Sequence, residues 1–299
     1  MNNMVDEKFE CISVICRLAG QEMYNSLDTD YQWEIELTFK KFKEHEAVKF
    51  MKKHLSLSCW DIPLMFAVHI EKKNGEFIFI EDINSLYNFD RWTEKKAEEF
   101  LLLFNKFYKD TNYAGFYNSN SHITYFEEVT EKFIEKSYKH IDFEWFGKYV
   151  DISNLRCIVS PSDSENNYCA VVNDKIIYCL AREISHAIVH EYCHSFANSI
   201  ARKWYDENPE FKRWCDESVD PERFLAYSSG LNMAYEYVAN AYSFLYYCQS
   251  KDTQIVIEGE NTFKWREIVP VTMTMYSRQG FPYISEIYLM VLALEYKDK

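Results

Sequence analysis

The stretch His190-Glu191-Tyr192-Cys193-His194 places two histidines four positions apart, with a glutamate directly after the first. The run from 183 to 204 around it has neither proline nor glycine, and its composition favours a helix. Residues four apart on a helix lie one above the other, so both imidazoles can face one metal ion while Glu191 reaches a water molecule beside it. Two nitrogen ligands with an adjacent carboxylate are typical of the zinc site of a hydrolase.

An apolar stripe on the same helix indicates which face is buried. We expect it to pack against a core through Val189, Cys193, Phe196, Ile200 and Trp204. The two histidines lie about a quarter turn from this stripe, at ~100° per residue. They should therefore lie at the rim between the core and a cleft. The alternative is a pair of half-exposed histidines on an ordinary amphipathic helix.

A catalytic zinc ion takes three protein ligands and leaves one position for water. We expect Glu236 to be the third ligand, because it lies in a second helical run, 231–242, among apolar and aromatic residues. A carboxylate in such surroundings is costly unless it is paired or binds metal. Asn240 shares its face and could hold a ligand histidine. The alternatives are a structural Glu236 paired with an arginine or tyrosine, and Glu217 or Glu222 as ligand, both of which we expect in a polar loop.

The composition of the chain indicates which partners it is expected to lack and in which compartment it is expected to lie. Its 299 residues carry a net charge of −14, which argues against a nucleic-acid partner. The nine cysteines are scattered and include no C-x-x-C pair, so we expect reduced thiols. No signal peptide and no apolar run long enough for a membrane span is visible. We therefore expect a cytoplasmic protein without a membrane partner.

The chain resembles the gluzincin-type zinc metallopeptidases and, more narrowly, a bacterial zincin-like family of unknown function built around the same motif. The resemblance implies one zinc ion held by His190, His194 and Glu236, with Glu191 as the catalytic base. The chain lacks a Gly-x-Met-Glu-Asn signature, so aminopeptidase activity is not implied, and Asn240 stands where relatives carry a basic residue. The metzincin pattern is absent as well, because Ala197 and Ile200 replace its glycine and histidine. The segments that carry the resemblance are 15–20, 121–126, 190–196, 235–238 and 280–284.

The pattern of elements predicts a mainly helical α+β fold. We expect a helical N-terminal lobe over 1–150 and a zincin-like catalytic lobe over 151–299, or one continuous domain. A small antiparallel sheet, with a hairpin over 168–180, should lie next to the helix of the motif. A polar break is expected at 249–261. Helices are expected within 8–51, 93–108, 121–140, 263–276 and 284–296, and a strand at 155–160. The range 61–69 is a further apolar segment, and 76–80 is expected to be a short strand or the approach to a loop.

The expected activity is hydrolysis of a peptide bond in a peptide or protein substrate. Glu191 would assist the attack of a zinc-bound water and pass the proton to the leaving nitrogen. The oxyanion needs a further donor, for which Tyr283 is our first choice, ahead of Tyr276, Arg278 and Tyr235. The alternatives are a non-catalytic binding protein with a zincin fold and a zinc hydrolase of a non-peptide substrate.

Overall fold

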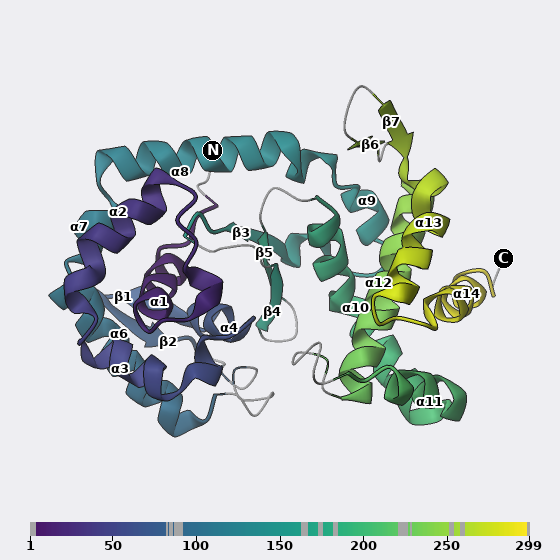
Figure 1. Cartoon of the computed structure of the whole chain (residues 1–299), viewed down its shortest axis with the longest axis horizontal. Coiled ribbons are helices and arrows are strands. Elements are labelled where there is room, and N and C mark those ends of the chain that lie inside the picture. The colour runs from purple at the N-terminus through teal and green to yellow at the C-terminus, as the bar shows by residue number, and fades with distance from the viewer. Residues whose placement is uncertain are drawn as a thin grey trace. The chain divides into compact units, whose positions relative to one another are not determined.

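The structure is a computed structural model whose described part forms two compact units (Figure 1). Unit 1 consists of Met1–Lys139 and Asn154–Ile184, and unit 2 of His140–Ser153 and Ser185–Lys299. The architecture is mainly helical with small sheets, so the expected α+β class is confirmed. The described residues are 4–81, 83, 86, 92–162, 167–172, 176–181, 185–220, 227, 229–250, 254–257 and 261–297.

Unit 1 is built mainly from helices whose first turns are closed by side-chain caps. Asp6, Thr29, Thr93 and Ser119 each accept a backbone N–H from the first turn of the following helix, which satisfies donors that the helix itself leaves unpaired. The helices are α1 (Glu7–Leu18), α2 (Asp30–Phe39), α3 (Glu46–Lys53), α4 (Ile62–Val68), α6 (Glu94–Asp110), α7 (Tyr113–Tyr117) and α8 (Asn120–Lys136).

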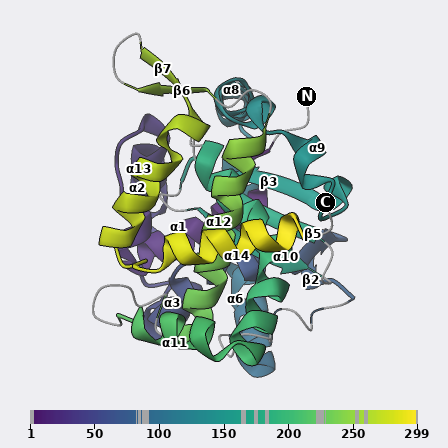
Figure 2. The same cartoon turned by 90° about the vertical axis from the view of Figure 1, so that its right-hand side faces the viewer.

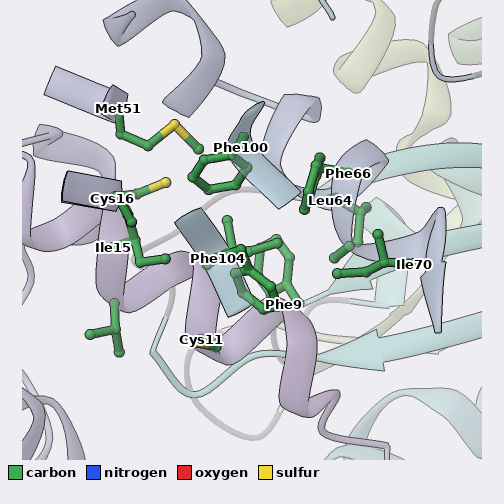
Figure 3. Close-up of a cluster of buried hydrophobic side chains, with 14 of the residues drawn as sticks. Phe9, Cys11, Ile15, Cys16, Met51, Leu64, Phe66, Ile70, Phe100 and Phe104 are labelled. Carbon is green, nitrogen blue, oxygen red and sulfur yellow. The ribbon is translucent and has the colours of Figure 1, made fainter. Parts of the chain in front are cut away.

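The core of unit 1 is strongly aromatic. Phe100 of α6 is fully buried, and its ring centroid lies 4.8 Å from that of Phe66 on α4 and 5.4 Å from that of Phe50 on α3. Phe9 of α1 and Phe104 of α6 are also fully buried, and their rings lie in the same cluster (Figure 3). Burial of such rings contributes a large apolar area to the packing of these helices.

A two-residue turn joins strands β1 (Ile70–Lys73) and β2 (Glu76–Phe79) into an antiparallel hairpin. Its central residues, Asn74 and Gly75, have φ angles of 53° and 88°. The two-residue turn whose twist matches that of the flanking strands requires a positive φ at both central residues. Asparagine and glycine adopt positive φ more readily than other residues, so Asn-Gly favours this turn. Of the two expectations for 76–80, the structure therefore shows the short strand, with β1 as its partner.

The second sheet of unit 1 contains β3 (Leu155–Val159), β4 (Tyr168–Val172) and β5 (Ile176–Ala181), in the order β3-β5-β4. The expected hairpin of β4 and β5 is confirmed, but β3 runs parallel to β5, so the sheet is mixed rather than purely antiparallel.

The compact units do not follow the expected boundary at residue 150. The sheet segment belongs to unit 1, because Ile158 and Val172 pack into the cluster of α1. The segment 140–153, by contrast, belongs to unit 2, where Trp145 lies 5.2 Å from Tyr246 between ring centroids.

Unit 2 is centred on two long helices, α10 (Ser185–Glu207) and α12 (Gly230–Gln249), which lie side by side (Figures 1 and 2). Figure 2 shows α14 (Ile284–Glu295) crossing α12. Where a polar break was expected, β6 (Gln254–Ile257) and β7 (Asn261–Lys264) form an antiparallel hairpin. The β-branched residues of this hairpin favour strand conformation, although the residues around them are polar. The remaining helices are α9 (Phe143–Phe146), α11 (Pro209–Glu217) and α13 (Trp265–Arg278).

Among the described residues, no helix combines the length and apolar character needed to cross a membrane.

Candidate metal centre

The face of α10 that packs on α12 differs slightly from the expected stripe. Val189, Cys193 and Phe196 are buried as expected, whereas Ile200 and Trp204 are only partly buried. The fully buried residues farther along this face are instead Ala197 and Ala201. Small side chains allow two helix backbones to approach closely, which brings the neighbouring polar side chains of α10 and α12 within reach of each other.

Three polar side chains meet where α10 passes α12. The Nε2 atoms of His190 and His194 are 3.1 Å apart. Glu236 of α12 places Oε2 3.3 Å from His190 Nε2 and Oε1 3.5 Å from His194 Nε2. Among the described residues, these three side chains are the only group of three or more potential metal ligands that lie close together.

The spacing of these donor atoms fits a zinc ion. Zinc–nitrogen and zinc–oxygen bonds of about 2.0–2.1 Å at tetrahedral angles place neighbouring donors about 3.3 Å apart. The three measured distances, from 3.1 to 3.5 Å, bracket that value. Two imidazole nitrogens and one carboxylate are also a donor set that zinc prefers. The side chains present therefore fit the ion that the sequence predicts.

The two histidines and the glutamate shift one another's pKa values. Burial alone would raise the pKa of Glu236, but the two histidines hold that pKa below its usual value. Burial lowers the pKa of His194. Burial acts in the same direction on His190, but the carboxylate of Glu236 outweighs it and raises the pKa of this ring. An ionised Glu236 and a neutral His194 are the protonation states that bind metal.

A hydrogen bond orients one of the two histidines. His194 Nδ1 lies 2.9 Å from the side-chain oxygen of Asn198, one turn along α10. Donation from Nδ1–H leaves Nε2 as the nitrogen that can bind a metal. Asn198 was missed in the sequence, although its spacing of four from His194 was a usable signal.

The other histidine is less firmly held. His190 Nδ1 is buried and has no hydrogen-bond partner at normal geometry within the described residues. Asn240, which is 5% exposed on α12, helps to raise the pKa of His190 and therefore lies beside this ring. The sequence-based expectation that Asn240 neighbours a ligand histidine is in accord with this placement.

Glu191 and two tyrosines lie close enough to the cluster to interact with its charges. Glu191 is partly exposed, and its charge helps to raise the pKa of His190. The pKa of Tyr227 is raised, first by the charge of Glu236, then by burial and by Glu191. Burial and Glu236 raise the pKa of Tyr276. Both phenols thus remain protonated and able to donate a hydrogen bond. Nothing in the sequence distinguished Tyr227 from the other members of a set of 23 tyrosines.

Tyr283, our first choice as oxyanion donor, makes other contacts. Its hydroxyl donates to Glu217 at 2.6 Å, and its ring stacks on Trp214 with centroids 5.5 Å apart. Glu217 lies at the end of α11 and not in a loop as expected, and it also pairs with Arg213 at 3.5 Å. Of the two rival ligands, Glu217 is thus held by these partners, and Glu222 lies outside the described residues.

Comparisons of the chain with protein-family models, curated proteins and solved structures find no match. The chemistry must therefore be inferred from the cluster itself. The side chains of His190, His194 and Glu236 are 20%, 11% and 19% exposed, so none of the three is fully buried. Structural zinc sites are closed by a fourth protein ligand, whereas catalytic sites keep a position open. Within the described residues, no fourth potential ligand joins the three.

Proposed function

We propose that this protein is a zinc-dependent hydrolase, and specifically a metallopeptidase. The observation that supports this proposal is the group of three donors on α10 and α12, to which the described residues add no fourth ligand, with Glu191 next to His190. A closed structural site would have no use for an uncoordinated carboxylate beside it. The free cysteines favour a reducing compartment, so we place the protein in the cytoplasm as part of the same proposal.

His190, His194 and Glu236 would hold the ion. When bound, zinc supplies a Lewis acid that stabilises developing negative charge and makes water more acidic. Glu191 accepts a proton from the attacking water and returns it to the leaving nitrogen of the cleaved peptide bond. Tyr227 and Tyr276 donate hydrogen bonds to the oxyanion, a role that requires protonated phenols.

The decisive experiment is a digest of a broad peptide library, with metal content measured by mass spectrometry. The zinc-loaded protein should cleave peptides, and a chelator should stop cleavage. Glu191→Gln should retain one zinc ion per chain and lose turnover by several orders of magnitude, because the base is gone while the ligands remain. Glu217→Gln removes an equal charge from the surface of the same unit and is the matched control, which should remain active.

The alternatives give different results in this experiment. Zinc binding without any peptide cleavage would contradict the peptidase proposal and favour a zinc hydrolase of another substrate or a binding protein. A protein that binds no zinc would contradict the proposal altogether. Loss of zinc in Glu191→Gln would contradict the assignment of Glu191 as base.

A further inference from the structure

The outer side of helix α14 in unit 2 is apolar. Leu289 is 63% exposed and Leu294 is 41% exposed, and Ala293 is exposed as well. A surface helix normally turns charged and polar side chains to the solvent, whereas a helix that is apolar all round is normally buried. The exposed side of α14 is therefore a candidate interface.

The inner side of α14 is already occupied by its own unit, because the helix packs across α12 (Figure 2). The fully buried residues of the helix are Ile284, Ile287 and Val291. Glu295 is also directed inward, since its carboxylate accepts hydrogen bonds from the hydroxyls of Tyr149 and Tyr242, each at 2.9 Å. The one other charged residue within the helix is Glu286, in the first turn.

The exposed side of α14 carries one charge at each end. Glu286 lies three residues before Leu289, and Lys297 lies four residues after Ala293, just beyond the end of the helix. These four residues fall within about a quarter turn of one another at ~100° per residue. Glu286 and Lys297 are both exposed, and neither forms an ion pair with another of the described residues.

A second copy of the chain fits this side of α14 in an antiparallel arrangement. A two-fold interface uses the same patch on both copies. When two α14 helices cross antiparallel at the point midway between Leu289 and Ala293, the larger side chain of each copy packs on the smaller one of the other. Glu286 then lies opposite the partner's Lys297, because the midpoint of 286 and 297 is within one residue of that of 289 and 293. The patch is thus complementary to itself in shape and in charge.

The composition of α14 disfavours a lipid surface as the occupant. Helices that lie in a membrane interface are rich in lysine and arginine, and α14 contains neither within its bounds. The net charge of −14 also opposes binding to anionic lipid. A second copy carries the same net charge, but the facing pairs of Glu286 and Lys297 lower the repulsion where the two copies meet.

We propose that two copies of this chain associate through the outer sides of their α14 helices, which cross antiparallel. Leu289 and Ala293 form the centre of the contact, and Glu286 and Lys297 form its two ends. A contact made by one helix from each copy is small, so the dimer should form reversibly. Association does not require zinc or the proposed hydrolysis.

Analytical ultracentrifugation of the full chain, at concentrations from about 1 µM to 1 mM, measures this association. The wild type should show a reversible equilibrium between monomer and dimer. Leu289→Asp should raise the dissociation constant about a hundredfold or more, because each copy would bury an unpaired carboxylate in the contact. Leu102→Asp, which changes a 73% exposed leucine of α6, is the matched control and should leave the dissociation constant unchanged.

Exchange of the end charges tests the antiparallel arrangement. Glu286→Lys and Lys297→Glu should each weaken association about tenfold, since each places like charges opposite one another. The double variant should recover the wild-type dissociation constant, because both pairs are restored with their signs exchanged. All four side chains are exposed in the single chain, so circular dichroism should show unchanged folding in these variants.

A wild type that stays monomeric at about 1 mM would overturn the proposal. Equal dissociation constants for Leu289→Asp and Leu102→Asp would overturn it as well, since the contact would then lie elsewhere. A double variant that stays as weak as the single ones would overturn the antiparallel arrangement. Binding of the monomer to phosphatidylcholine vesicles, without dimer formation, would instead identify a lipid surface as the occupant.

Discussion

His194 Nδ1 lies 2.9 Å from the side-chain oxygen of Asn198, which is four residues further along the same helix. This contact favours the tautomer with the proton on Nδ1 and orients the ring, so Nε2 is directed toward Glu236 and is free of a proton for the proposed zinc ion. The spacing of four residues on one helix therefore places the candidate ligand next to the group that orients it.

Replacing Asn198 with alanine should weaken zinc binding by about 10- to 100-fold, the usual cost of losing such a supporting hydrogen bond. Competition with a zinc-sensitive dye measures this affinity. Ser199→Ala is a suitable control, because Ser199 is exposed and its hydroxyl donates to the carbonyl of Phe196. Equal affinities for the wild type and Asn198→Ala would show that the contact does not support the ligand.

Removing one phenolic hydroxyl at a time should identify the oxyanion donor. We expect Tyr227→Phe to lower kcat by about 10²–10³, the usual effect of deleting one such donor, with little change in KM. Tyr276→Phe tests the second phenol on which Glu236 acts. Tyr283→Phe should have a small effect, because its hydroxyl donates to Glu217. A large loss in Tyr283→Phe alone would instead support the sequence-based choice.

Zinc should stabilise the folded protein in proportion to its affinity. At a free concentration about 100 times the Kd, the free energy of unfolding should rise by about 2.7 kcal/mol. Thermal unfolding with and without a chelator measures the effect. Glu236→Gln should remove most of it and Glu217→Gln should retain it. The opposite result would make Glu217 the third ligand.

Glu10 should make the stability of unit 1 depend on pH. It is fully buried and accepts hydrogen bonds from Tyr31 and Ser160, and burial raises its pKa to about 7. The folded state then binds this proton more tightly than the unfolded chain, whose glutamate titrates near 4.5. Stability should therefore fall as pH rises from about 4.5 to above 7, by about 3 kcal/mol.

Denaturant unfolding across this pH range measures the effect of Glu10. Glu10→Gln should show a flatter profile than the wild type, since its side chain carries no titrating proton. Glu98→Gln changes an exposed position on α6 and should leave the profile as it is. Parallel profiles for Glu10→Gln and the wild type would show that Glu10 does not titrate in this window.

Local patterns in the sequence predicted local features well. The helix of the motif and the helix expected within 93–108 follow from neighbouring residues, and the structure contains both. The approach of Glu236 to His190 was also predictable, since a carboxylate among apolar residues needs a partner.

Features that depend on distant parts of the chain were not predicted. The assignment of β3 to unit 1 depends on contacts such as the 2.9 Å hydrogen bond from Val159 N–H to the carbonyl of Met4. The proximity of Tyr227 to Glu236, which raises the pKa of this phenol, is likewise a tertiary contact. Neither leaves a period or a spacing in the sequence, because each results from tertiary packing.

The division of the chain into interleaved segments also affects its synthesis and its dissection. Unit 1 needs residues up to 184, and unit 2 needs the segment 140–153 that precedes the last part of unit 1. A ribosome-bound chain therefore cannot complete unit 1 until the sheet segment has left the exit tunnel. At that point the segment 140–153 has also been synthesised, but the helices of unit 2 against which it packs have not. Cutting the gene at codon 150 would yield two incomplete fragments, and a separable unit 1 requires a version in which a short linker replaces 140–153.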